Sequence, residues 1–239
     1  MSNEYYAPGG QRAQRVSDLF GRIARRYDLI NDLQSFGLHR LWKRRVVELA
    51  SVRAGDRALD VCCGTGDIAF ALTARGADVI GLDFSEAMLE VARKKSPKAE
   101  LRNPEFIRGD AMRLPFPDAS FHAVTVGYGL RNLADWEVGL NEMARVAKPG
   151  GRMVVLEFGK PANAVWRALY FCYLRLAVPV FGLLFCGDLA AYSYILESLR
   201  HYPAQKGVER KMRDLGLTNI RVINLLGGAM SINCGEKSR

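Results

Sequence analysis

The sequence predicts an α/β fold built on one mostly parallel, seven-stranded β-sheet, and three observations support this prediction. From Arg57 onward, short apolar runs such as ALDVCC, DVIGLDF and MVVLEF alternate with amphipathic stretches such as EAMLEVARKK. Strands that alternate with helices form parallel βαβ units. The last two apolar runs are separated by Gly227 and Gly228, which is typical of an antiparallel hairpin. At 239 residues, the chain can bury one sizeable core.

The positions of the individual elements follow from the same alternation. A turn is expected where the sequence reads KPGG, at 148–151, and a further helix ends at Gly216. We expect strands at 58–63, 78–84, 105–110, 121–129, 153–158, 219–226 and 229–235, with helices at 67–75, 86–95 and 136–146.

Two segments lie outside this alternation. In the first 52 residues, Val16, Leu19, Phe20 and Ile23 recur at three- and four-residue steps, which predicts a helix, a break at Gly37 and a second helix. Residues 160–203 form an apolar insertion. We therefore expect a single domain over 1–239, consisting of a helical lid (1–52), a core (53–159), the insertion (160–203) and a C-terminal helix and hairpin (204–239).

The charge is unbalanced, with 34 Lys and Arg against 25 Asp and Glu, a formal net charge of +9. This favours a nucleic acid, an anionic membrane or an anionic ligand as partner, although a solvated basic face without a partner is an equal alternative. The excess is dense before the core, at Arg22, Arg25, Arg26, Arg40, Lys43, Arg44 and Arg45.

Cysteine usage and hydropathy indicate a cytoplasmic protein. The five cysteines have neither C-x-x-C nor His-rich spacing, so we expect no disulfide framework and no metal site. The N-terminus lacks the apolar stretch of a signal peptide. The longest nearly uncharged run, Leu176 to Gly187, is shorter than the roughly 18 apolar residues needed to span a bilayer, although lying on a membrane stays open.

The glycine-rich turn LDVCCGTGD follows an expected strand and opens an expected helix, so a ligand could approach its backbone closely. The turn also fits G-x-G-x-x-A with an acidic residue about 20 positions later, which is the dinucleotide fingerprint. Three features favour a sulfonium nucleoside instead. Asp60 would repel a pyrophosphate but attract an amino group, Asp110 could accept from an adenine amino group, and the C-terminal hairpin is foreign to a dinucleotide half.

Together these residues predict S-adenosylmethionine as cofactor and a class I methyltransferase with a Rossmann-like fold. Asp83 would accept from both ribose hydroxyls, and the run LPFPDASF (114–121) would wrap the adenine. Any one carboxylate alone could be a strand-end turn residue. Cys62 stands where the class has Gly, and we interpret Cys62 and Cys63 as packing residues, not nucleophiles. The expected cofactor residues are Asp60, Gly64, Thr65, Gly66, Asp83, Phe84, Asp110, Ala111 and Gly127.

Four blocks of sequence resemble the ubiquinone and menaquinone biosynthesis C-methyltransferases, and the likeness covers nearly the whole chain. They are RRYDLINDLQSFGLHRLWKR, VGYGLRNLAD, RVAKPGGRMVVLEFG and AYSYILESLRHYP. The chain departs from the family at three positions. It has Ile30 where the family usually has Met, Ala147 where the family has an aliphatic residue, and Gly159 where the family has Ser or Thr. The resemblance implies methyl transfer to a ring carbon of a reduced prenylated quinone, such as demethylmenaquinol. Whether the acceptor is a naphthoquinol or a benzoquinol, and how long its tail is, stay open.

The acceptor carbon becomes nucleophilic when the neighbouring hydroxyl loses its proton. Shifting a phenolic pKa from near 10 to neutral takes roughly 4 kcal/mol. Arg131, just beyond the edge of the fourth strand, would face the cofactor in this topology and stabilise or generate the quinolate, with Asn132 orienting it. Tyr27, Asp28, Asn31 and His39 would form the lid, with His39 or Asp28 as alternative bases. Tyr27 and His39 could instead only pack, and Arg131 could be a structural ion-pair partner.

The insertion offers a surface for an isoprenoid tail. An apolar stripe of this kind is more often core, but Arg167 and Arg175 accompany it, as on a membrane-docking surface. We therefore expect peripheral contact with the inner face of an anionic membrane. The stripe comprises Trp166, Leu169, Tyr170, Tyr173, Leu174 and Ala177, and the run from Val178 to Phe185 continues it.

Two other functions are compatible with parts of the sequence. The positive charge suggests an RNA methyltransferase, but the Asn/Asp-Pro-Pro-aromatic motif and a Pro-Cys nucleophile are absent, so no nucleic-acid partner is expected. A non-catalytic, cofactor-binding scaffold in a quinone-making assembly is the other alternative. The sequence does not set the oligomeric state, and a homodimer is compatible with it.

Overall fold

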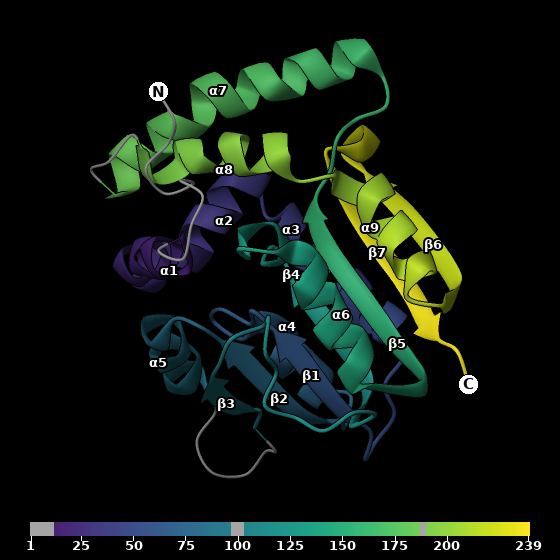
Figure 1. The fold of residues 1–239 in the computed structure, drawn as a ribbon. Helices are drawn as coiled ribbons and strands as arrows, with labels where there is room; N and C mark the ends of the chain where they lie inside the picture. Colours follow the sequence, from purple (N-terminus) through teal and green to yellow (C-terminus); the bar gives the residue numbers. More distant parts are fainter. Residues whose placement is uncertain (1–11, 97–102, 187–189) are drawn as a thin grey trace.

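A computed structural model describes residues 12–96, 103–186 and 190–239, without the side chains of 12–17, 25, 181–186 and 190–194. The expectations for Val16, Arg25 and the side chains of 181–185 therefore lie outside the described residues. A central β-sheet is covered by helices on both faces, and two further helices lie beyond the carboxyl ends of its parallel strands (Figure 1). This arrangement confirms the predicted α/β class.

The sheet has seven strands in the order β3-β2-β1-β4-β5-β7-β6. The first five strands pair in parallel, whereas β7 is antiparallel to both of its neighbours. The final strand of the chain is thus inserted between β5 and β6, and β6 forms the edge. The strands are β1 (Arg57–Val61), β2 (Asp78–Asp83), β3 (Glu105–Arg108), β4 (Phe121–Gly127), β5 (Ala147–Phe158), β6 (Leu217–Leu225) and β7 (Met230–Lys237).

The helices divide between the two faces of the sheet. One core cluster joins the sheet to α3, α4 and α5, and the other joins it to α6 and α9. The helices are α1 (Arg12–Ile23), α2 (Tyr27–Ser35), α3 (Leu38–Ala50), α4 (Asp67–Thr73), α5 (Glu86–Lys95), α6 (Trp136–Val146), α7 (Ala164–Cys186), α8 (Ala190–His201) and α9 (Ala204–Asp214).

Two local predictions need correction. The first N-terminal helix is not continuous, because the 3-10 turn η2 (Ala24–Arg26) separates α1 from α2, while the predicted break at Gly37 is present. The KPGG turn lies inside β5 instead of ending it. There the pairing with β4 jumps from Phe121–Ala147 to Ala123–Arg152, so the extra residues form a bulge that includes Gly150 at φ +76°.

The insertion folds into α7 and α8, which pack on each other beyond the carboxyl ends of β4 and β5 (Figure 1). Trp166 fixes α7 to the C-terminal hairpin, because its Nε1 donates to the Leu226 carbonyl at 2.8 Å. The apolar stripe has two roles, since Tyr170 and Leu174 are buried whereas Leu169 is exposed. Within the described residues, no helix is long and apolar enough to cross a bilayer.

Candidate active site

The glycine-rich loop turns the chain from β1 into α4 through three left-handed residues, Cys62 (φ +53°), Gly64 (φ +55°) and Gly66 (φ +84°). This conformation is natural for Gly and uncommon for Cys. Cys62 therefore occupies a position with glycine-like geometry, as the class pattern suggests. Burial raises the pKa of the Cys62 thiol well above its usual value, so the thiol stays protonated and fits the predicted packing role.

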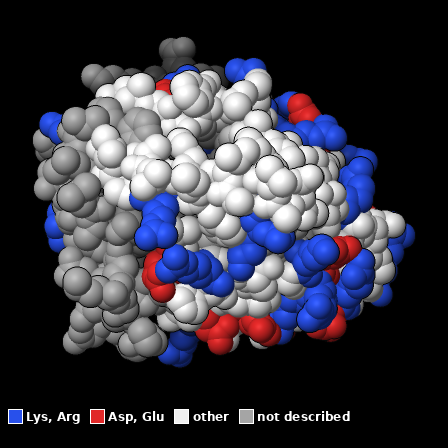
Figure 2. Space-filling model, turned by 90° about the horizontal axis from the view of Figure 1, so that it is seen from above, with Lys and Arg blue, Asp and Glu red and all other residues white. Residues whose placement is uncertain are grey.

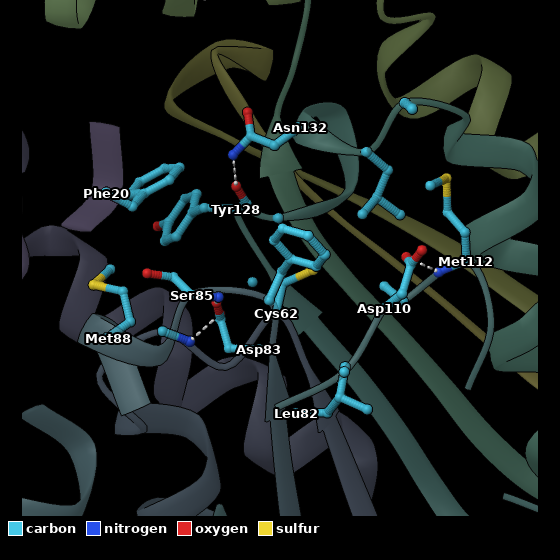
Figure 3. Close-up of a pocket in the computed structure, with 18 of the residues that line it drawn as sticks. Phe20, Cys62, Leu82, Asp83, Ser85, Met88, Asp110, Met112, Tyr128 and Asn132 are labelled. Carbon is cyan, nitrogen blue, oxygen red and sulfur yellow. Dashed lines mark hydrogen bonds between the residues drawn. The ribbon is translucent and has the colours of Figure 1, made fainter. Parts of the chain in front are cut away.

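A cavity of about 100 Å³ opens at the carboxyl ends of β1, β2 and β4 (Figure 3). On its floor, Asp83 accepts hydrogen bonds from the backbone N–H groups of Gly64 and Ser85, both at 2.8 Å. Asp110 accepts from the Met112 N–H at 2.8 Å on the other side of the cavity. Each carboxylate oxygen has a second lone pair. Both side chains can therefore accept further bonds from ligand hydroxyl or amino groups.

Asp60 borders a smaller polar recess beside this cavity, together with Lys43 and Gly127. Its Oδ1 accepts from Thr125 Oγ1 at 2.8 Å, but its Oδ2 is buried without a hydrogen bond from the protein. Burial raises the pKa of Asp60 to about 7. A Cβ at Gly127 would lie 2.7 Å from Ile68 Cδ1, so the recess needs Gly there. An unpaired carboxylate oxygen suits the ammonium group of a methionine moiety.

Most of the predicted cofactor residues are brought together at these two spaces. Gly66 is the exception, because it lines neither and a Cβ there would lie 2.7 Å from Phe106, which makes it a packing residue. The run 114–121 also lines neither, since Arg145 holds it by donating to the carbonyls of Phe116 and Leu114. The residues at the cavity are Gly64, Asp83, Phe84, Asp110, Ala111 and Gly127, and those at the recess include Asp60 and Thr65.

A second cavity, of about 400 Å³, adjoins the first and is lined mainly by apolar side chains. We call it the acceptor cavity. Its walls come from α1, α2 and α3, the ends of β4 and β5, the helices α7 and α8, and the C-terminal hairpin. Phe20, Tyr27 and Tyr128 line both cavities. These three aromatic residues therefore form the boundary between the two spaces.

Arg131 lies at the acceptor cavity and not at the cofactor cavity, which corrects the expectation that it faces the cofactor. Its buried guanidinium forms an ion pair with Glu157 at 3.0 Å and lies 4.5 Å from the centre of the Phe158 ring. Asn132 does line the cofactor cavity. Its Nδ2 donates to the Tyr128 carbonyl at 3.2 Å, and its Oδ1 is buried without a hydrogen bond from the protein.

The lid residues separate into an inner and an outer group. Tyr27 is inside, packed edge-on against Phe20, and burial raises the pKa of Tyr27 to about 12, so its hydroxyl is a donor at neutral pH. Asp28 lines neither large cavity. Instead it accepts from Thr65 Oγ1 at 2.7 Å and pairs with Lys95, which fastens α2 to the glycine-rich loop and to α5.

His39 lines the acceptor cavity from α3 and is 3% exposed. Its Nε2 lies 2.8 Å from Asp32 Oδ1, and its Nδ1 is buried without a hydrogen bond from the protein. Burial lowers the pKa of His39 more than the Asp32 hydrogen bond raises it. The imidazole is therefore neutral at neutral pH and presents a basic Nδ1 if Nε2 carries the proton that Asp32 accepts.

Sequence reasoning missed Tyr128, which lines the cofactor cavity, the acceptor cavity and the polar recess. It also missed Phe20 as a cavity residue, together with Ser85 and Met88. The sequence offers one signal for Tyr128, which stands between two glycines at the end of an expected strand. In the structure it adopts φ +63°. An aromatic residue in that conformation is a genuine outlier and points to a functional position.

A carboxylate-edged pocket at the switch between β1 and β4 of this sheet defines an S-adenosylmethionine-dependent methyltransferase of class I. The model of the ubiE/COQ5 methyltransferase family matches residues 9–237, and the chain belongs to this family. It is 41% identical to the demethylmenaquinone methyltransferase of Staphylococcus aureus (strain JH9) over 229 residues, which cover 95% of this chain and 94% of the relative.

Solved structures agree on the fold. A SAM-dependent methyltransferase from Aquifex aeolicus matches with a TM-score of 0.61 at 18% identity, over 87% of this chain and 97% of the other. Phosphoethanolamine N-methyltransferase 2 of Haemonchus contortus, solved in complex with S-adenosyl-L-methionine, matches with a TM-score of 0.59 at 15% identity, over 83% of this chain and 52% of the other. At such low identity, the likeness shows a common fold alone and does not identify an acceptor for this chain.

Proposed function

We propose that this chain transfers a methyl group from S-adenosylmethionine to a ring carbon of demethylmenaquinol, giving menaquinol and S-adenosylhomocysteine. One observation carries the proposal. A cavity of about 100 Å³ that is lined by the carboxylates of Asp83 and Asp110, and an apolar cavity of about 400 Å³, share a wall formed by Phe20, Tyr27 and Tyr128. The first fits a charged nucleoside, and the second has the size and apolar lining that a fused ring with an isoprenoid tail requires.

The chemistry asks little of the protein beyond alignment and one proton transfer. S-adenosylmethionine, when bound, supplies a methyl group on a sulfonium, which leaves without acid assistance. The residues of the chain must hold the ring carbon in line and accept the proton of the adjacent hydroxyl. The ring hydrogen is lost when aromaticity is restored. The net reaction therefore replaces one ring hydrogen by methyl and releases one proton.

His39 is the base that we favour. His39 lines the acceptor cavity with its Nδ1 unpaired, and the Asp32 carboxylate would stabilise the imidazolium formed on proton uptake. Asp28 is a weaker candidate because it lines neither large cavity and already pairs with Lys95. Arg131 lies in the same cavity and would stabilise the quinolate, but Glu157 balances much of its charge. We expect His39→Gln to lower kcat about 100-fold and to remove the acidic limb of the pH–rate profile.

The reaction itself is tested by incubating the protein with methyl-labelled S-adenosylmethionine and reduced demethylmenaquinone carrying a short prenyl tail. Mass spectrometry should find the label on the naphthoquinol ring. A parallel reaction with a demethylated benzoquinol shows whether the acceptor is shared with ubiquinone synthesis. Cofactor binding without label transfer to either acceptor would support a scaffold instead and contradict the proposal.

We infer further that the protein works in the cytoplasm, docked on the inner face of an anionic membrane. The outer side of α7 exposes Val165, Leu169 and Leu176 at 71%, 58% and 64%. Phe36, exposed at 88%, also lines the acceptor cavity. Figure 2 shows a broad uncharged surface on this side, with Lys and Arg side chains at its border. Arg167 and Arg175 are exposed on the same helix.

Flotation with liposomes tests this docking. We expect binding to anionic vesicles at low salt, weaker binding at high salt, and a loss of about tenfold in the triple variant Phe36→Ser/Leu169→Ser/Leu176→Ser, because the contact combines apolar burial with charge attraction. Equal binding of the wild type and the variant, or no flotation of the wild type at low salt, would contradict it.

A further inference from the structure

The acceptor cavity contains a group of buried polar atoms that the protein does not pair. These atoms are Asn31 Nδ2, Gln34 Nε2, His39 Nδ1 and Tyr128 Oη. Buried polar atoms in folded proteins are nearly always hydrogen-bonded, and leaving one unpaired opposes folding. Four such atoms around one apolar cavity are therefore a feature that needs a physical explanation.

Other polar groups that line the same cavity are paired by the protein. Tyr170 donates to the Ala229 carbonyl at 3.1 Å, and Trp166 donates to the Leu226 carbonyl at 2.8 Å. The Tyr173 hydroxyl donates to the Gln34 carbonyl at 3.4 Å. These three groups come from α7, whereas the unpaired atoms come from α2, α3 and the end of β4. The paired groups therefore belong to α7, and the unpaired groups belong to the elements that face it or adjoin it.

Tyr128 is held at the boundary between cofactor and acceptor. Its N–H donates to the Leu156 carbonyl at 2.8 Å, and its own carbonyl accepts from Arg131 and Asn132 at 2.7 and 3.2 Å. These bonds fix a bulky residue in the left-handed region at φ +63°. Figure 3 shows its ring beside Phe20, at the rim of the cofactor cavity. The backbone of Tyr128 is therefore fixed at the boundary between the two cavities.

Gln34 lines the acceptor cavity but not the cofactor cavity. It is three residues after Asn31 on α2, so both side chains lie on one face of the helix. The Asn31 Nδ2 is buried without a hydrogen bond from the protein, so it is available as a second amide donor beside Gln34 Nε2. Amide nitrogens and a phenolic hydroxyl all donate to oxygen. The natural ligand of this set is a ring that carries more than one oxygen.

We propose that Tyr128 hydrogen-bonds the ring oxygen next to the reacting carbon and that Gln34, with Asn31, hydrogen-bonds the second ring oxygen. This inference rests on the proposed function and adds a specificity to it. The acceptor cavity selects a ring with two oxygens, and the apolar remainder holds the tail. An acceptor with a single ring oxygen would leave the amide groups of α2 unpaired and would be rejected.

Two acceptors with the same short prenyl tail test the assignment, the 1,4-naphthoquinol and the naphthol that keeps only the hydroxyl next to the reacting carbon. The wild type should prefer the quinol by about tenfold in kcat/KM, the value of one hydrogen bond to a neutral group. Gln34→Met should reduce this preference to about twofold or less. Tyr128→Phe should lower kcat/KM about tenfold for both acceptors and keep the preference.

Tyr170→Phe is the matched control, since it removes a hydroxyl from the same cavity that the protein already pairs. We expect it to lower Tm and to keep the preference for the quinol. Tyr128→Phe should instead leave Tm unchanged or raise it, because it removes an unpaired buried hydroxyl. Opposite effects of the same chemical change on Tm separate a ligand-binding hydroxyl from a structural one.

The outcomes separate the two proposals. If the wild type methylates the quinol and Gln34→Met keeps the full preference, this inference alone is overturned. That result is expected if water, and not the second ring oxygen, pairs the amide groups of α2. Equal losses for both acceptors in Gln34→Met would also contradict it. A wild type that methylates neither acceptor would remove the proposed function and this inference together.

Discussion

The cofactor cavity and the acceptor cavity are built in opposite ways. In the first, the acidic side chains are paired with nearby backbone, Asp83 with Gly64 and Ser85 and Asp110 with Met112. In the second, Gln34 Nε2 and Tyr128 Oη find no partner in the protein. The protein therefore orders the carboxylates of Asp83 and Asp110 by itself and leaves part of the acceptor cavity to be completed by its ligand.

The two cavities also differ in the charge of the side chains around them. Asp60, Asp83 and Asp110 place negative charge around the cofactor cavity and its recess, which suits a sulfonium with an ammonium group. The acceptor cavity contains Arg131, but Glu157 balances it. A neutral, apolar acceptor therefore meets no net charge on entry. If a quinolate forms there, its stabilisation depends on this one ion pair and on the neutral donors.

The largest effect should follow from breaking that ion pair. Arg131→Met leaves Glu157 buried and uncompensated, so we expect the free energy of unfolding to fall by about 3–5 kcal/mol. Denaturant unfolding measures the loss. The double variant Arg131→Met/Glu157→Gln should recover most of it while remaining inactive. A loss below about 1 kcal/mol in the single variant would show that Arg131 is not structural and would strengthen a purely chemical role.

The next largest effect should come from a change in the cofactor cavity. Asp83→Ala removes the carboxylate that accepts from the glycine-rich loop and that we propose as the ribose partner. We therefore expect the Kd for S-adenosylhomocysteine to rise about 100-fold, the value of two good hydrogen bonds to a charged group. Calorimetry measures it. Asp78→Ala is the control, because Asp78 lies on the same strand at the opposite, exposed end. Similar losses in both variants would mean that Asp83 acts only through the sheet.

Asp60 gives a pH-dependent test of the same half. With its pKa raised to about 7, folded Asp60 keeps a proton that the unfolded chain loses near pH 4, so this residue makes stability fall as pH rises from about 4 to 7. An ammonium group binds the ionised form, so cofactor affinity should rise over pH 6 to 8. Asp60→Asn should remove both slopes and weaken binding about tenfold at pH 8. Calorimetry across this pH range measures affinity, and an unchanged slope in the variant would exclude Asp60 as the ammonium partner.

The contrast between the two regions also explains what the sequence could predict. The cofactor cavity depends on strand-to-helix turns within residues 59–111, where the carboxylates of Asp60, Asp83 and Asp110 lie at or just beyond the carboxyl ends of β1, β2 and β3. Asp60, Asp83 and Asp110 could therefore be placed from the strand pattern alone. Gly66 could not be separated from Gly64, because the difference lies in the contact with Phe106, which comes from another strand.

The acceptor cavity was less predictable because segments far apart in the chain meet there. Arg131 follows β4 by four residues, and its direction is set by Glu157 at the end of β5 and not by its own strand. The family resemblance indicated His39 and Tyr27 as lid residues, but not that His39 lines the acceptor cavity while Asp28 contacts the glycine-rich loop. Tyr128 was missed because its importance comes from a backbone conformation that periodicity does not reveal.

The smallest effect concerns the isoprenoid tail, and it tests most directly whether the acceptor cavity holds that tail. Leu169 lines the acceptor cavity, whereas Leu176, two helical turns later on α7, does not. Leu169→Ser should cost about 1 kcal/mol of apolar contact, equal to about a fivefold rise in KM for a long-tailed acceptor, and much less for one with no tail. Steady-state assays in detergent with acceptors of increasing tail length measure this dependence. Leu176→Ser should keep the wild-type dependence on tail length. If the two variants change the dependence of KM on tail length equally, the tail does not lie in the acceptor cavity, and this cavity would recognise only the ring.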